Sequence, residues 1–258
     1  MLQRLIVVFF GLLWIYSFPG LPPPAEAADP KGAVPNIELY FPSETGSEWR
    51  YLGTVVDQIQ RVGNYVNVTT ISGTTVKNGV QVQVFSETNQ ADNGPADSYF
   101  SIDQYGITYY GSSPTTTFEK QIVPYKIVSF PVYLHQNYPQ LDKRGLNFGR
   151  DLDQDGTDEQ VDVIADIAID GLEPVSVPGG VFNGCLKMTG TMNLYITLSS
   201  SHKVVKMVDI TTNWFAPGVG LVKGIERTDF PSINGSPAQS TEIIEELQST
   251  SIGGKSRH

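Results

Sequence analysis

Apolar and polar residues alternate with a period of two along most of the chain, and the pattern is clearest from Val161 to Asp170. All odd-numbered positions from 161 to 169 are apolar, whereas the even-numbered positions include three aspartates. Successive side chains of a strand point to opposite faces, so this spacing puts one face in a core and the other in water. A helix would mix the two sets, and we therefore predict a half-buried β-strand here.

Shorter runs rich in Val, Ile, Thr and aromatic residues, separated by Gly, Asn, Asp and Ser, predict further strands. Two of these runs flank the turn Gln104-Tyr105-Gly106 as a hairpin. Only Thr241–Gln248 looks helical, because acids follow Ser240 as a possible N-cap. The chain is thus predicted to be mostly β, with at most one short C-terminal helix. The other predicted strands cover residues 79–87, 98–103, 107–110, 185–198, 203–214 and 220–230, with 199–202 as a connection.

Residues 1–27 have the features of a secretory signal peptide. Arg4 supplies a positive charge, an uncharged apolar run spans Leu5 to Ser17, and Ala25-Glu26-Ala27 fits a cleavage site after three prolines. The alternative is an uncleaved membrane anchor, but a spanning helix needs about 20 apolar residues and this run is shorter. We therefore predict export to the periplasm or the extracellular space.

The predicted mature chain divides into three parts. Residues 28–37 are rich in Pro and Gly and predict a flexible leader, and residues 38–248 form the β-rich domain. The polar, irregular stretch 137–158 is a candidate meeting point of two halves. Residues 249–258 are polar and Gly-rich, which predicts a disordered tail.

Charge and cysteine content narrow the classes of function. The net charge is −10 and stays there without the signal peptide, which removes one Arg and one Glu. Such an acidic chain is a poor nucleic-acid binder. Cys185 is the only cysteine, which excludes an intramolecular disulfide and a lipid-anchoring cysteine after the signal. No later segment is apolar enough to span a membrane.

Acidic residues recur at calcium-ligand spacing between residues 151 and 162. Acids stand at loop positions one, three, five, nine and twelve, and Gly156 occupies position six, where a sharp turn is needed. Calcium binds about six to eight oxygen atoms, which alternate aspartates in a curling loop can supply. The predicted ligands of a structural calcium ion are Asp151, Asp153, Asp155, the carbonyl of Thr157, Glu159 and Asp162.

Three features separate this loop from an EF-hand. Position eight is Asp158, position twelve is Asp162 instead of a bidentate Glu, and no helix flanks the loop. An Asp at position twelve resembles the loops of dockerins, and the order of loop and strand resembles the DxDxDG loops of integrin-type propeller repeats. The alternative is an acidic turn without an ion, because Asp and Gly favour turns in any case.

Catalytic motifs are weak. His135, His202 and His258 have no metal-ligand spacing, and no GxSxG motif is present. Cys185 has no paired histidine and is expected to be a buried apolar residue. A pair of catalytic carboxylates cannot be chosen by spacing, and no catalytic or cofactor-binding residue is predicted.

Several segments resemble a group of exported bacterial proteins of unknown function. They are Tyr40-Phe41-Pro42 with Gly46–Tyr51, Val177–Phe182 with Cys185-Leu186-Lys187, and Trp214–Lys223, which reads WFAPGVGLVK. The resemblance implies an antiparallel sheet curled into an incomplete barrel, as in periplasmic lipoprotein carriers. It also implies that Trp49 and Trp214 plug the open curl and that Gly218 and Gly220 let a strand bend after Pro217.

These observations leave three hypotheses. The first is an exported, non-enzymatic binding or structural protein that holds a lipid or other apolar ligand on a concave sheet. The second is a calcium-stabilised surface or matrix protein that acts through protein or glycan contacts, and the third is a hydrolase. A deep apolar cavity would favour the first, exposed aromatic residues the second, and buried acids converging in a cleft the third.

Overall fold

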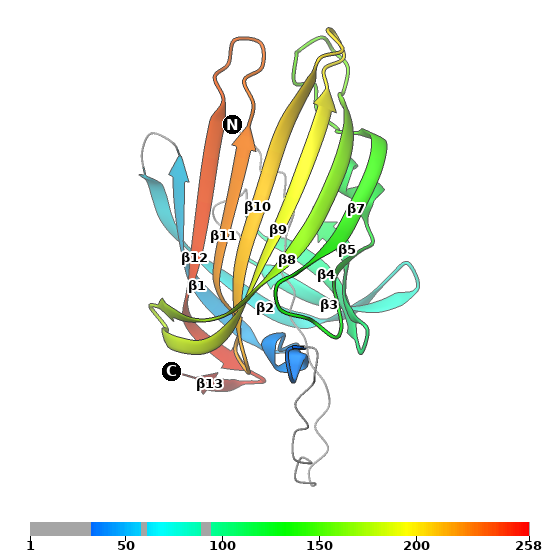
Figure 1. The fold of residues 1–258 in the computed structure, drawn as a ribbon. Helices are drawn as coiled ribbons and strands as arrows, with labels where there is room; N and C mark the ends of the chain where they lie inside the picture. Colours follow the sequence, from blue (N-terminus) through cyan, green and yellow to red (C-terminus); the bar gives the residue numbers. More distant parts are fainter. Residues whose placement is uncertain (1–31, 58–60, 89–93, 258) are drawn as a thin grey trace.

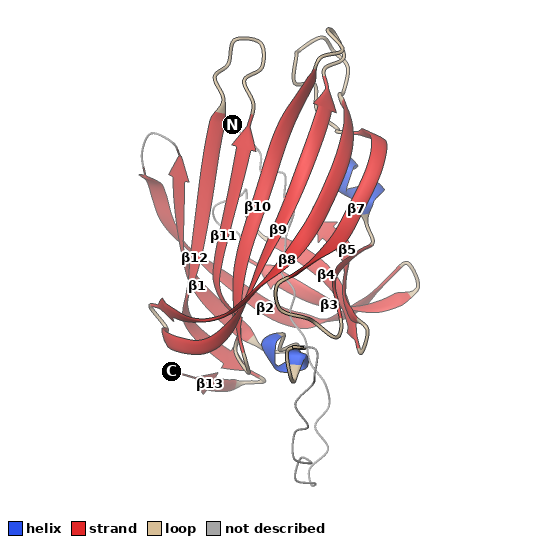
Figure 2. Ribbon diagram, in the orientation of Figure 1, coloured by secondary structure: helices blue, strands red, loops and turns tan. Residues whose placement is uncertain are grey.

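The computed structural model describes residues 32–57, 61–88 and 94–257. Strands make up most of this part, and one short α-helix lies within it (Figure 2). The elements in chain order are η1 (Ile37–Tyr40), β1 (Glu48–Asp57), β2 (Arg61–Lys77), β3 (Val80–Glu87), β4 (Ala96–Asp103), β5 (Gly106–Ser113), α1 (Thr117–Ile122), β6 (Tyr125–Ser129), β7 (Gln136–Asn147), β8 (Gln160–Val177), β9 (Gly180–Thr197), β10 (Val204–Ala216), β11 (Gly220–Phe230), β12 (Gln239–Ile252) and β13 (Lys255–Arg257).

All strands belong to one antiparallel sheet that curls until it is nearly closed as a barrel (Figure 1). The strand order is β6-β5-β4-β3-β2-β1-β12-β11-β10-β9-β8-β7, and β13 pairs with β12. The chain therefore forms two meanders, β1–β6 and β7–β12, which are joined by the long pairing of β1 with β12 from Glu48↔Ser251 to Asp57↔Thr241. The predicted mostly β, antiparallel, incomplete barrel is confirmed.

The seam of the barrel lies between β6 and β7, which are the two ends of the strand order. Side chains bridge these edges where a backbone ladder would otherwise run. Gln140 donates its amide Nε2 to the Ile127 carbonyl (2.7 Å), and Lys143 donates Nζ to the Gln121 carbonyl (2.8 Å). Gln121, at the end of α1, donates Nε2 to the Asn147 carbonyl (2.7 Å). Polar side chains and one helix thus cover the sheet edges, which limits pairing with another chain.

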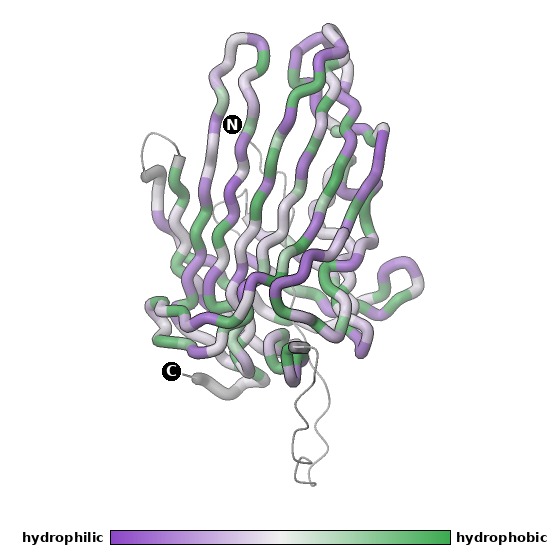
Figure 3. Tube along the Cα trace, in the orientation of Figure 1, coloured by the Kyte–Doolittle hydropathy of each residue, from purple (hydrophilic) through white to green (hydrophobic). Residues whose placement is uncertain are grey.

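The core fills the inside of the barrel. The odd-numbered residues from Val161 to Ile169 are all buried and their even-numbered neighbours are not, so the predicted strand and its inward face are confirmed. The alternation continues in the neighbouring strands, where green and purple segments succeed one another along the trace (Figure 3). Phe41 closes one end of the core by packing on Phe215, with ring centroids 4.9 Å apart, and on Phe130 at 6.1 Å.

The predicted C-terminal helix is wrong. Residues 241–248 lie inside β12, paired with β1 on one side and β11 on the other. The inward face of this strand is Ile243, Glu245 and Leu247, and a buried glutamate interrupts the apolar alternation that would have predicted a strand. The one α-helix of the described part is α1, which begins after Thr116, whose Oγ1 accepts a hydrogen bond from the Glu119 amide (3.0 Å).

Two predicted boundaries also need correction. The tail is not disordered, because residues 249–252 continue β12 and residues 255–257 form β13. The leader is not loose from residue 33 onward, since Ala33 bridges Tyr133 and Val34 is buried. Residues 28–31 and the predicted signal peptide, residues 1–27, lie outside the described residues.

The polar stretch 137–158 proved to be partly a strand. Its first half belongs to β7, an edge strand whose pairing with β8 shifts register between Pro139 and Leu141 and again between Lys143 and Leu146. These irregularities and the exposure of an edge removed the expected alternation. The two meanders instead change over at residues 130–135, between β6 and β7. No helix of the described part combines the length and apolarity needed to cross a membrane.

Candidate functional site: acidic loop and barrel interior

The acidic loop lies between β7 and β8 and brings three of its six predicted ligands together. Asp151, Asp153 and Glu159 each offer a carboxylate oxygen, and these three atoms lie within 4.8 Å of one another. Carboxylate oxygen is the ligand type that calcium prefers, so the donor chemistry of the cluster fits the predicted ion. A full shell needs about six to eight oxygens, and waters would have to supply several of them.

Backbone amides already approach these carboxylates. Asp151 accepts from the amides of Asp155 (3.1 Å) and Gly156 (2.8 Å), which curls the loop around its first residue. Glu159 is fully buried and accepts from the amides of Leu152 (3.1 Å) and Ser199 (2.6 Å). The loop therefore has its own internal order, and a bound cation would share these oxygens with N–H donors.

A serine-rich turn from the next hairpin docks on the loop. Ser200 donates to one Asp153 oxygen from both its hydroxyl (2.6 Å) and its amide (3.0 Å), and Ser199 donates its hydroxyl to Asp155 (2.8 Å). The hydroxyl of Ser200 is the main cause that lowers the pKa of the Asp153 carboxyl below its ordinary value, followed by the Ser200 amide. The sequence predicts residues 199–202 only as a connection between strands, and nothing local in it signals a contact with residues more than forty positions away.

The other three predicted ligands lie apart from the cluster. Asp155 is exposed and accepts the Thr157 amide (2.9 Å), and Thr157 is exposed as well. Asp162 lies in β8, where it accepts the Gly145 amide (2.8 Å) and pairs with Arg144 (3.4 Å). Because β8 begins at Gln160, Asp162 is already a strand residue, and its carboxylate contacts β7 instead of the loop.

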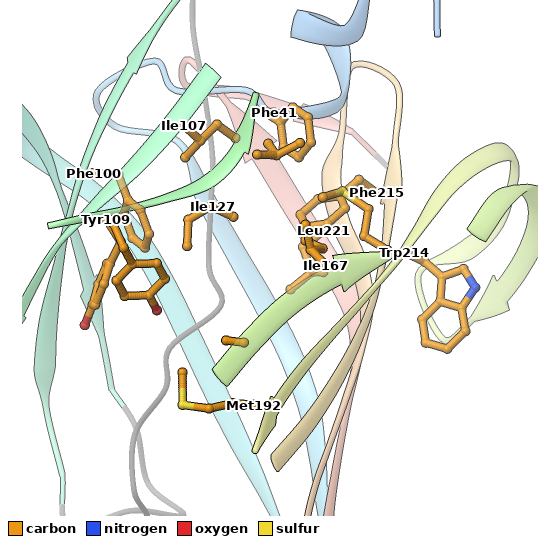
Figure 4. Packing of buried hydrophobic residues seen from close by; sticks show 14 of the residues in the cluster. Phe41, Phe100, Ile107, Tyr109, Ile127, Ile167, Met192, Trp214, Phe215 and Leu221 are labelled. Atoms are coloured by element: carbon orange, nitrogen blue, oxygen red, sulfur yellow. The ribbon is translucent and has the colours of Figure 1, made fainter. Parts of the chain in front are cut away.

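The interior of the barrel contains a second candidate site. A pocket of about 10 Å³, which is room for about one water molecule, lies where the two meanders face each other. Its walls are mostly apolar, with Ile127 and Ile107 opposite Ile167 and Phe215 and with Phe41 at one end (Figure 4). The residues that line it are Phe41, Ile107, Ile127, Ile167, Met188, Gly190, Thr211, Asn213 and Phe215.

A polar band lies beside this pocket. The inward face of β10 continues from Phe215 through Asn213 and Thr211 to Asp209, and all four are buried. Buried acids also stand on β3, α1 and β12. In the described part of the chain no Lys, Arg or His is buried, so the interior is electronegative. The buried acids of the barrel are Glu87, Glu119, Asp209 and Glu245.

Two tyrosines border this band. The Tyr109 hydroxyl donates to one oxygen of Glu119, and the Ser112 hydroxyl donates to the other (2.8 Å). The Tyr125 hydroxyl is buried and has no hydrogen-bond partner among the described residues. Burial, then the charges of Glu119 and Asp209, raise the pKa of Tyr125 well above its usual range, so it stays a neutral phenol.

The motif residues divide between inside and outside. Trp49 is fully buried and donates Nε1 to the Val219 carbonyl (2.7 Å), and Tyr51 donates its hydroxyl to the Leu221 carbonyl (3.1 Å). These bonds fix the start of β11 against β1. Gly218 at φ 69° and Gly220 at φ 90° lie in the turn between β10 and β11, so the chain reverses direction here instead of bending within one strand.

Trp214 does not plug the curl. Its ring points away from the interior (Figure 4), and its Nε1 donates to Glu173 (2.5 Å), whose side chain is half exposed. Lys187 lies over the ring at 5.3 Å. Phe215 takes the inward position, so its neighbour Trp214 faces the other side of the sheet, where it is nevertheless buried at 9% exposure.

The cysteine and the described histidines have no surroundings that would support catalysis. Cys185 is buried, and burial raises the pKa of its thiol to about 11, so little thiolate forms at neutral pH. His135 and His202 are both exposed, and each lies in a turn with positive φ. His258 lies outside the described residues.

Neither a known family model nor a curated protein matches the chain. Two solved structures have a similar fold. One is a candidate lipoprotein from Parabacteroides distasonis, with 14% identity and a TM-score of 0.38 over 81% of this chain and 97% of that one. The other is a candidate exported protein with a YmcC-like fold from Bacteroides fragilis, with 14% identity and a TM-score of 0.36 over 82% of this chain and 98% of that one. Similarity at this level transfers no function.

Proposed function

We propose that this chain is an exported, non-enzymatic binding protein whose ligand enters the interior of the barrel. The observation that carries the proposal is the interior pocket, which is lined from both meanders and bordered by polar side chains. Ligand sites are typically apolar hollows with a few polar groups that orient the ligand. Export rests on the signal peptide predicted from residues 1–27, which places the protein in the periplasm or outside the cell.

The seam supplies the entrance. The pocket of about 10 Å³ holds one water, so a larger ligand needs the walls to separate. Within the sheet, neighbouring strands are joined by backbone ladders, whereas β7 is held by side chains, with Gln140 reaching β6 and Lys143 reaching α1. Each such hydrogen bond contributes only about 0.5–1.5 kcal/mol net, so the seam is the weakest wall.

A pocket-filling substitution tests the proposal. Gly190 lies in β9 and lines the pocket, so Gly190→Val fills it, while Gly63→Val adds the same side chain where a Cβ meets no atom within 4 Å. We expect 1-octanol to bind to the exported protein and to Gly63→Val in calorimetric titrations, and to bind at least about tenfold more weakly to Gly190→Val. Equal affinities in all three proteins would rule out the interior site.

We further propose a structural calcium ion at Asp151, Asp153 and Glu159. The support is that three carboxylates share one small volume, where they repel one another unless hydrogen bonds or a cation offset their charge. The ion would hold the loop against the 199–200 turn at the end of the barrel. Calcium is plentiful outside the cytoplasm, so a weak site, on the order of 10⁻⁴–10⁻³ M, would fill there.

A hydrolase is the second candidate, because Glu119 and Asp209 are buried acids on opposite walls of the interior. Carboxylate pairs of this kind perform acid–base hydrolysis in other proteins. If the protein hydrolyses nitrophenyl glycosides or esters, and Asp209→Asn abolishes this activity, the hydrolase hypothesis would take the place of the binding proposal. The surface-protein hypothesis has less support, since Tyr105 is the only aromatic among the large hydrophobic side chains exposed in the described segments.

A further inference from the structure

We propose that the interior site selects ligands whose polar end is a protonated amine, held between Asp209 of β10 and Tyr125 of β6. This inference rests on the proposed function, because it names the chemical class that the interior site would take. The ligand it describes is a primary amine with a short alkyl chain. Its chain would lie in the apolar pocket and its ammonium group in the polar band.

The layers of the barrel place these two residues across from each other. At the closed end, Phe41 contacts both Phe215, near the end of β10, and Phe130, which directly follows β6. Further in, Ile127 and Thr211 line the same pocket. Tyr125 and Asp209 each stand two residues before these, and side chains two apart in a strand share a face. They therefore form the next layer, directly beside the apolar pocket.

The electrostatic response of Tyr125 agrees with this placement. Burial is the main cause of the raised pKa of Tyr125, and the charges of Glu119 and Asp209 raise it further. Both carboxylates therefore lie close to the phenol. Glu119 already receives hydrogen bonds from Tyr109 and Ser112. Asp209 comes from β10, so acceptor oxygens approach the phenol from two different elements.

Tyr125 provides an observation that is independent of the acids. Its side chain is only 5% exposed, and its hydroxyl has no hydrogen-bond partner among the described residues. An unsatisfied buried hydroxyl costs about 1–3 kcal/mol, so it is uncommon without a reason such as a missing partner molecule. A phenol oxygen accepts a hydrogen bond from an ammonium group, and its own O–H can donate to a carboxylate.

Charge decides between ligand classes. Asp209 is 3% exposed, the interior holds three further buried acids, and no basic side chain is buried in the described part of the chain. A desolvated carboxylate favours a cation over a neutral group and strongly disfavours an anion. An ammonium group carries three donors and one positive charge, so it suits both the Asp209 carboxylate and the Tyr125 oxygen. A fatty acid would bring a further carboxylate beside Glu119 and Asp209.

The test compares three ligands of equal chain length by calorimetric titration of the exported protein at pH 7: 1-octylamine, 1-octanol and octanoate. Charge-assisted hydrogen bonds contribute about 1.5–3 kcal/mol, and 1.4 kcal/mol equals a tenfold change in affinity. We therefore expect octylamine to bind at least about tenfold more tightly than octanol, and octanoate to bind most weakly.

Two variants assign the preference to the named residues. Asp209→Asn should remove the advantage of octylamine over octanol, whereas Asp166→Asn, the same change on the outer face of β8, should keep it. Tyr125→Phe removes a hydroxyl that has no hydrogen-bond partner among the described residues, so the variant should fold at least as stably as the parent and bind octylamine several-fold more weakly.

The outcomes separate this inference from the proposed function. Equal binding of all three ligands, or an amine preference that survives in both Asp209→Asn and Tyr125→Phe, would overturn the amine site while leaving an apolar binding protein. Failure of every ligand to bind would overturn the interior site as a whole. If Asp209→Asn does not fold, Tyr125→Phe decides alone.

Discussion

Trp49 should contribute more to the free energy of unfolding than Trp214, the other tryptophan of the described part of the chain. Trp49 is fully buried, and its Nε1 donates to the Val219 carbonyl at 2.7 Å. Trp49→Phe leaves that carbonyl without this donor, which costs about 1–3 kcal/mol, and removes part of the ring, which costs roughly another 1 kcal/mol. We expect a loss of about 2–4 kcal/mol, a large share of a typical 5–15 kcal/mol.

Trp214→Phe is the matched control. The ring of Trp214 lies on the outer face, its bond goes to a half-exposed Glu173, and a phenylalanine ring keeps a surface for Lys187. We expect a smaller loss of about 1–2 kcal/mol. Trp214 is only 9% exposed, so removing part of its ring costs roughly 1 kcal/mol, but its half-exposed partner Glu173 can replace the lost hydrogen bond with water. Both variants make the same change of side chain, so the difference between their losses of stability reports the difference between the two positions.

Urea unfolding followed by tryptophan fluorescence measures both variants. The predicted exported form lacks Trp14, so each variant keeps one tryptophan, and its fluorescence reports the other position. Circular dichroism at strand wavelengths supplies a second probe, and agreement between the probes tests the two-state assumption. Equal losses, or a larger loss in Trp214→Phe, would refute the placement of Trp49 as the bond between β1 and the start of β11.

Three further predictions concern the loop and the β8–β9 turn. Millimolar calcium should raise the melting temperature relative to EDTA, and Asp151→Asn should abolish this rise while Asp162→Asn retains it; a rise lost only in Asp162→Asn would favour the sequence-based ligand set over the structural cluster. The pKa of Asp153 is lowered in the folded state, so its contribution to stability is present above its ordinary value of 3.8 and is lost as pH falls through the lower folded value. In Asp153→Asn, acid titrations of unfolding should show a shallower loss below about pH 4, and an unchanged slope would contradict the Ser200 contact. Gly179→Ala should destabilise by about 1–3 kcal/mol in urea, because the new Cβ would lie 3.0 Å from the Leu247 carbonyl oxygen, which accepts the Gly179 amide; Gly63→Ala, where a Cβ meets nothing, should not destabilise.

The sequence predicted those parts of the fold whose signal is local. The strand from Val161 to Asp170 was recognisable because all its inward positions are apolar. The strand at β12 was missed because Glu245 faces inward, where Tyr65 donates its hydroxyl to the carboxylate (2.7 Å), and an isolated sequence gives no reason to bury a glutamate. The edge strand β7 was missed because its register shifts disturb the alternation.

In the candidate sites, too, the sequence predicts local features and misses contacts between distant segments. Spacing alone placed Asp151, Asp153 and Glu159 in one loop, and the curl of that loop brings their carboxylates together. It could not identify Ser200, which arrives from another hairpin, nor place Asp162 against β7. The influence of Asp209 on Tyr125 depends on two meanders closing on each other, and neither residue has a neighbour in sequence that would single it out.

The most direct test of an interior ligand site is to detect the ligand beside interior side chains. Met188, Met192 and Met207 are all buried on inward faces of β9 and β10, and the remaining methionine is the first residue of the chain. In the exported protein with ¹³C-labelled methionine methyl groups, bound 1-octanol should give intermolecular nuclear Overhauser effects to Met188, which lines the pocket. Saturable binding without any effect on the methionine methyl groups would place the ligand on the outer surface and contradict the account.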